Sequence, residues 1–143
     1  MHKLRTLNLP RHRGRDFFAT VFVEPDPEDF DSFDPSIDAE QWGISVHFQP
    51  EDHYASHVEI ARIDTEHGEP HFDRLYAPDQ RTDWLGQDYS YQNARRELLS
   101  NWRECADKFF DNHYDQVMAP QVGRGQVQRD AMVASDDGEE LLD

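Results

Sequence analysis

The chain has 143 residues, the length of one ordinary domain with a single continuous core. Only 36% of the residues are hydrophobic but 12% are aromatic, so aromatic side chains must supply much of the buried surface. No apolar run approaches the roughly 18 residues that a membrane span needs, and the basic first residues lead into no apolar segment. We therefore expect neither a membrane span nor a signal peptide.

Charge is the strongest compositional signal. Thirty acidic residues stand against 14 basic ones, for a net charge of −16, and Asp outnumbers Glu by 19 to 11 and Arg outnumbers Lys by 12 to 2. This composition is typical of proteins from halophilic archaea, because the Debye length falls to about 3 Å at 1 M salt and self-repulsion is screened. A nucleic-acid mimic is the alternative, but the acids are spread over the whole chain. The single cysteine, Cys105, cannot form an internal disulfide. We expect a cytoplasmic protein adapted to high salt.

Three segments differ in composition. Residues 1–15 carry five basic residues and no acid, which predicts a basic N-terminal arm that pairs with the acidic body or, alternatively, contacts phosphate or an acidic partner. Residues 16–114 form the expected single α+β domain. Residues 115–143 lose all periodicity and end in a run of acids, which predicts an acidic C-terminal arm or a disordered tail.

Four stretches have the pattern of strands. Residues 16–24 are rich in Phe and Val, residues 42–48 alternate apolar and polar side chains, and residues 56–64 and 71–77 flank a turn at 66–70 that contains Gly and Pro. Because short turns separate the last three stretches, the pattern favours an antiparallel meander over a parallel βαβ unit.

One long helix follows a loop at 78–88. Ser90 is a suitable N-cap, and apolar residues then recur at helical spacing through 91–113. The sequence therefore predicts an α+β fold in which an antiparallel sheet of about four strands carries one long C-terminal helix on one face.

Ionisable residues gather on the last two predicted strands and on the turn between them. No phosphate-binding loop, zinc-binding cysteine pair or serine-nucleophile motif is present. Side chains two apart on a strand share a face, so Arg62 should lie beside Asp64, and His71 beside Asp73. The candidate catalytic residues are Arg62, Asp64, His67, His71 and Arg74.

The two histidines allow three interpretations. In the first, His67 and His71 act as base and acid in metal-independent RNA cleavage, while an arginine holds the phosphate. In the second, both histidines and Asp64 or Asp73 bind a divalent metal, although the spacing matches no recurring ligand pattern. In the third, the charges form ion pairs and the histidines are simply exposed. We expect the first, with no metal or other cofactor.

The same segment resembles a known family. The runs 62–65 (RIDT), 67–68 (HG) and 70–73 (PHFD), followed by a helix that bears Trp102, are similar to the core of the TumE-type toxins of toxin–antitoxin systems. The match covers roughly residues 42–110. The resemblance implies a small α+β toxin that acts on RNA and is neutralised by an antitoxin protein.

Three positions depart from the family pattern. Ile63 stands at an aromatic position, Thr65 at an Asn position, and Asp73 where a second strand histidine is expected. The alternative function, from another class, is a non-catalytic protein–protein interaction module that binds a partner through its arms or its acidic loop.

Overall fold

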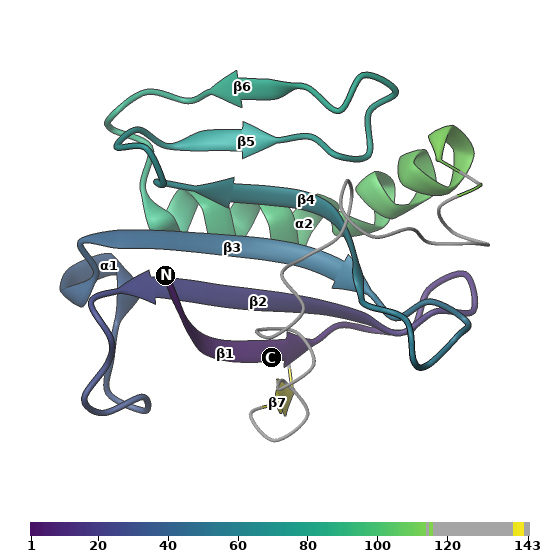
Figure 1. The fold of residues 1–143 in the computed structure, drawn as a ribbon. Coiled ribbons are helices and arrows are strands. Elements are labelled where there is room, and N and C mark those ends of the chain that lie inside the picture. Colours follow the sequence, from purple (N-terminus) through teal and green to yellow (C-terminus); the bar gives the residue numbers. More distant parts are fainter. Residues whose placement is uncertain (114, 116–138, 142–143) are drawn as a thin grey trace.

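In the computed structural model, which describes residues 1–113, 115 and 139–141, one long helix packs behind an open sheet (Figure 1). Six strands of this described part pair antiparallel in chain order, so each strand lies beside its neighbours in sequence. These strands are β1 (His2–Asn8), β2 (Phe17–Glu24), β3 (Gln41–Phe48), β4 (Val58–Asp64), β5 (His71–Asp73) and β6 (Thr82–Trp84). A short strand β7 (Glu139–Leu141) pairs parallel with β1. The α+β meander is therefore confirmed, with two more antiparallel strands than the four expected.

The long helix α2 (Tyr91–Asn112) matches its prediction closely. The Ser90 side chain accepts a hydrogen bond from the backbone N–H of Asn93, as an N-cap does. Figure 1 shows α2 behind the sheet, and its apolar stripe packs against β3 and β4. The buried residues of the stripe are Tyr91, Ala94, Leu98, Trp102, Cys105, Ala106 and Phe109. A short helix α1 (Pro35–Asp38) lies between β2 and β3 in the chain.

Aromatic rings fill the layer between the sheet and α2. The rings of Phe17 and Trp102 lie 5.1 Å apart, and those of Phe48 and Phe109 lie 5.9 Å apart edge to face. All four side chains are buried, so the aromatic-rich composition serves the core as expected. Cys105 is also buried here, and burial raises the pKa of its thiol to about 11.

The other face of the sheet carries polar side chains. A bulge in β4, opposite Val46 and His47 of β3, inserts one extra residue and shifts the alternation of side chains. Glu59 and Arg62, three positions apart, therefore lie on the same polar face, where their side chains form an ion pair. This shift gathers more charge at one end of the sheet than strict alternation would.

Several boundaries differ from the expectation. Residues 1–15 were predicted to be an arm, but they contain β1, and Arg5 donates hydrogen bonds to the backbone carbonyls of Phe30 and Phe33. Of the C-terminal segment 115–143, all but 115 and 139–141 lies outside the described residues. None of the described helices is long and apolar enough to cross a membrane.

Candidate functional site

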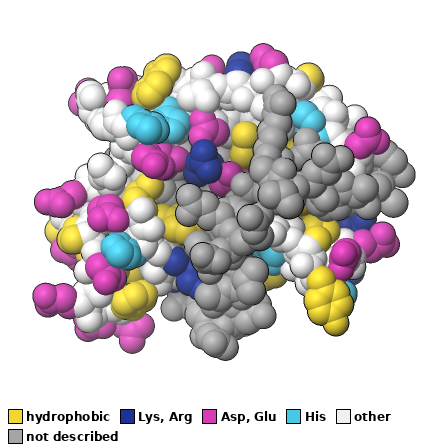
Figure 2. All heavy atoms as spheres, viewed as in Figure 1, with side chains coloured by type: hydrophobic (Ala, Val, Ile, Leu, Met, Phe, Trp, Pro, Cys, Tyr) yellow, Lys and Arg dark blue, Asp and Glu magenta, His cyan; other side chains and the backbone are white. Residues whose placement is uncertain are grey.

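A pocket opens where β4 ends and β5 begins, on the face away from α2. Its volume is about 320 Å³. Figure 2 shows histidine, carboxylate and basic side chains together at the upper left of this face, where Figure 1 places the ends of β4 and β5. The pocket is lined by Arg62, Asp64, Glu66, His67, His71, Asp73, Thr82 and Trp84.

Arg62 holds three carboxylates together behind the pocket. Its Nη1 donates to Glu59 Oε1 at 2.8 Å, its Nη2 donates to Asp73 Oδ2 at 2.7 Å, and its Nε lies 2.8 Å from Asp64 Oδ2. Burial alone would lower the pKa of this guanidinium, but the three carboxylates raise it above its ordinary value. Arg62 is thus permanently charged and already engaged, so it organises the acids and has little capacity left for a ligand.

The acids that Arg62 contacts are themselves buried. Burial raises the pKa of Glu59 to about 7, although Arg62 and a hydrogen bond from Ser45 act in the opposite direction. Burial likewise raises the pKa of Asp64, against the effects of His71 and Arg62. One guanidinium therefore does not fully compensate the carboxylates, and further positive charge beside them would be favourable.

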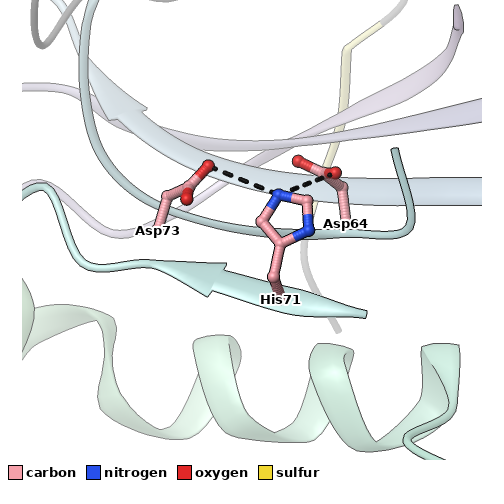
Figure 3. A group of neighbouring side chains, drawn as sticks. All are labelled: Asp64, His71 and Asp73. Atoms are coloured by element: carbon pink, nitrogen blue, oxygen red, sulfur yellow. Dashed lines mark ion pairs between the residues drawn. The ribbon is translucent and has the colours of Figure 1, made fainter. Parts of the chain in front are cut away.

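His71 points between two of these carboxylates (Figure 3). Its Nε2 lies 3.2 Å from Asp64 Oδ1 and 3.7 Å from Asp73 Oδ2, while its Nδ1 lies 3.2 Å from the backbone carbonyl of Glu69. Since a carbonyl only accepts, Nδ1 carries the proton, and a neutral ring would turn the lone pair of Nε2 toward the carboxylates. A positive charge at Nε2 would therefore be attracted by both carboxylates.

Both aspartates are held in place by further hydrogen bonds. Asp64 Oδ1 accepts from the backbone N–H of Glu66 at 2.8 Å, and Asp73 Oδ1 accepts from the Thr82 hydroxyl at 2.6 Å. Because β4, β5 and β6 each contribute one of these groups or its partner, the sheet itself fixes the orientation of the carboxylates.

The rim of the pocket is aromatic. His67 sits exposed on the turn after β4 with a φ of 73°, and its ring centroid lies 6.4 Å from that of His71. On the other side Trp84, 59% exposed, places its ring 5.1 Å from His71. The two rings flank an opening whose floor is His71 and the carboxylates.

Four of the five predicted site residues line this pocket together: Arg62, Asp64, His67 and His71. Arg74 does not, because its position on the strand directs it to the opposite face, where it pairs with Asp83 and lies over the Phe72 ring at 4.1 Å. The predicted same-face pairs, Arg62 with Asp64 and His71 with Asp73, are both present.

Four further residues of the site, Glu59, Glu66, Thr82 and Trp84, were not predicted to belong to it. Glu59 reaches Arg62 only because of the bulge in β4, and no local sequence pattern predicts this bulge. Thr82 and Trp84 belong to a strand of three residues, too short to show an alternation.

A second polar group lies further along the same face. A chain of hydrogen bonds runs from Thr6 through Thr20 and His47 to His57, and the two imidazole Nδ1 atoms lie 2.8 Å apart. Burial, and to a lesser extent His57, lowers the pKa of His47 well below its ordinary value. This group is buried and lines no part of the pocket.

Comparison of the chain with models of known protein families, with curated proteins and with solved structures finds no match.

Proposed function

We propose that the pocket cleaves phosphodiester bonds, with RNA as the substrate class that the sequence resemblance implies. One observation carries the proposal: His67 and His71 line the same pocket, and Asp64 contacts the Nε2 atom of His71. Two histidines and an orienting carboxylate around one opening are the groups that proton transfer to and from a bound substrate requires.

RNA cleavage needs a base for the 2′-hydroxyl, an acid for the leaving oxygen, and a positive charge beside the phosphoryl oxygens. In our proposal His67, exposed on the rim, exchanges a proton with the substrate. A positive charge bound beside Asp64, His71 and Asp73 would face the phosphate. Arg62 keeps the carboxylates in place instead of holding the phosphate, which changes the role first expected for it.

The test is cleavage of a labelled single-stranded RNA by the purified full chain, in 0.1 M and in molar KCl. His67→Ala should lower the rate by about 100-fold or more, the usual contribution of a proton-transferring group. His71→Ala should also lower the rate strongly, because it removes the side chain that would hold the positive charge beside the phosphate. His53→Ala, an exposed histidine outside the pocket, and Arg74→Met, on the opposite face, should leave the rate unchanged. No cleavage by the wild-type chain in either salt, or equal loss in the two control variants, would refute the proposal.

Expression in cells tests the toxin aspect separately. If the chain is an RNA-directed toxin, its expression without the neighbouring gene should arrest growth, and His71→Ala should relieve the arrest. A chain that cleaves RNA in vitro but leaves growth unaffected would be a nuclease without a toxin role.

A second candidate function is a non-catalytic interaction module, and Trp84 favours it. This side chain is 59% exposed on β6, the outermost strand of the described sheet on that side. Exposed tryptophans are frequent anchors of protein interfaces. If this function is right, Trp84→Ala abolishes the capture of one stoichiometric partner protein, and His71→Ala has no effect on it. Loss of RNA cleavage in His71→Ala with partner capture unchanged would mean that both functions are present.

A further inference from the structure

Ligand atoms of Asp64, His71 and Asp73 converge at one point of the pocket. We propose that they bind a divalent transition-metal ion through Asp64 Oδ1, His71 Nε2 and Asp73 Oδ2 (Figure 3). This inference concerns binding and stands whether or not the substrate is RNA. It replaces the initial expectation of a site without metal.

The distances from His71 Nε2 to the two carboxylates fit a shared ion. The three ligand atoms lie within 4.8 Å of one another, with Nε2 at 3.2 Å and 3.7 Å from the two oxygens. An ion about 2.0–2.2 Å from each ligand places neighbouring ligand atoms about 3–3.5 Å apart. The two distances from Nε2 match this range to within a few tenths of an ångström, and the two carboxylate oxygens, which lie within 4.8 Å of each other, would move closer together around an ion.

Each ligand also has the outer partner that metal ligands usually have. The Nδ1–H group of His71 donates a hydrogen bond to the Glu69 carbonyl, which leaves Nε2 as the coordinating atom. The Thr82 hydroxyl and the Glu66 backbone N–H fix the two carboxylates, and Arg62 contacts both. A carboxylate oxygen has two lone pairs, so Asp73 Oδ2 can accept from Arg62 and bind the ion together.

The negative charge of the pocket favours a divalent ion over a single proton. Among the lining residues that the structure describes, three carboxylates stand against one guanidinium, which leaves two negative charges when both histidines are neutral. A proton on His71 compensates one of these charges, whereas a divalent ion compensates both. An ion here also leaves coordination positions that face the open pocket, where water or a substrate oxygen can bind.

The ligand types indicate which ion. One imidazole with two carboxylates suits Mn²⁺, Fe²⁺ or Zn²⁺ better than Ca²⁺ or Mg²⁺, which prefer oxygen ligands alone. We choose Mn²⁺ as the probe because its electron paramagnetic resonance signal reports free ion directly. Binding should be measured on the full chain after chelator dialysis, in 1 M KCl, where weak binding to surface acids is screened.

We expect one tightly bound Mn²⁺ per chain. Asp73→Asn and His71→Gln should each weaken binding at least tenfold, whereas Asp83→Asn should not change it. Asp83 is the matched control, because it is an ion-paired aspartate on the adjacent strand whose partner Arg74 lies outside the pocket. As a readout independent of variant folding, Mn²⁺ should broaden the ring resonances of wild-type His71 and leave those of exposed His53 sharp.

A wild-type dissociation constant for Mn²⁺ in the millimolar range or weaker would overturn the proposal. An affinity of Asp73→Asn within threefold of the wild type, or broadening of the His53 resonances instead of those of His71, would overturn it as well. The two proposals can fail independently. RNA cleavage that persists in chelator, with no Mn²⁺ bound, would refute the metal site alone. Tight binding of Mn²⁺ without any RNA cleavage would refute the proposed substrate alone.

Discussion

Arg62→Met is the most informative single substitution, because Arg62 is the one arginine among the described residues that line the pocket, and Met keeps much of its aliphatic bulk. Arg62 reaches Glu59, Asp64 and Asp73 at 2.7–2.8 Å, and these carboxylates are almost completely buried. Breaking a buried ion pair typically costs about 3–5 kcal/mol, since the remaining charge is left uncompensated. The Arg62 side chain is 37% exposed, and solvent screening reduces the cost. We therefore expect the free energy of unfolding at pH 8 to fall by about 2–4 kcal/mol.

The loss of stability in Arg62→Met should depend on pH. Without Arg62 the folded-state pKa values of the carboxyls rise, and the uncompensated charges disappear as pH falls and the carboxyls bind protons. Glu59 already has a pKa of about 7 with Arg62 present, so the stability difference between variant and wild type should shrink between pH 8 and pH 5.

The assay is urea unfolding followed by far-UV circular dichroism at both pH values. Arg81→Met is the control, because Arg81 is 53% exposed and lies 3.5 Å and 3.9 Å from its two carboxylates. It should cost less than about 1 kcal/mol at either pH. Equal losses in the two variants, or a difference that grows toward pH 5, would refute the description of Arg62 as the organiser of the buried acids.

Three further results are expected. Burial lowers the pKa of His47, so below about pH 6.5 the unfolded chain binds a proton that the folded chain does not. The free energy of unfolding should therefore decrease as the pH is lowered in this range. His47→Gln should flatten this slope by up to about 1.4 kcal/mol per pH unit, measured by urea unfolding. Gly43→Ala places a Cβ 2.9 Å from the Cβ of Asp64, so it should cost about 1–3 kcal/mol in the same assay and weaken Mn²⁺ binding. The net charge of −16 predicts a thermal midpoint that rises from 0.1 M to 3 M KCl, measured by calorimetry.

Each of these three predictions has a control or an outcome that would contradict it. His53→Gln, at an exposed position, should keep the wild-type slope, and an unchanged slope in His47→Gln would contradict the role of burial. Wild-type stability and Mn²⁺ affinity in Gly43→Ala would mean that the strands separate there without disturbing the site. Sucrose at equal osmolality should raise the thermal midpoint less than KCl does, and a midpoint that falls with KCl would exclude adaptation to high salt.

The sequence predicted the parts of the fold whose side-chain pattern repeats. Strands β2, β3 and β4 and helix α2 were all recognised, since each shows several turns or alternations of one period. Strand β1 was taken for an arm because its basic residues, Lys3 and Arg5, interrupt the apolar pattern and a bulge lies between them. Strand β6 was missed because three residues show no period.

The candidate site was predictable only as far as strand parity applies. Parity placed Arg62 with Asp64 and His71 with Asp73, and it also put Arg74 on the opposite face, which should have excluded Arg74 from the site. The convergence of Asp64 with Asp73 depends on the register of β4 against β5, which is a property of the folded chain. Local spacing therefore suggested no metal, although the pairing of two strands brings the three ligand atoms together.

The alternation of side chains along β4 and β5 separates the residues that support the core from the residues that form the pocket. Ile63 and Phe72 point toward α2 and support the core, whereas their neighbours Asp64, His71 and Asp73 point into the pocket. Substitutions at the second set can alter ligand or reaction without touching the residues that hold the helix on the sheet. A chain built in this way can change its chemistry through point mutations of one hairpin while the scaffold keeps folding, which makes this hairpin a natural place to redesign the site.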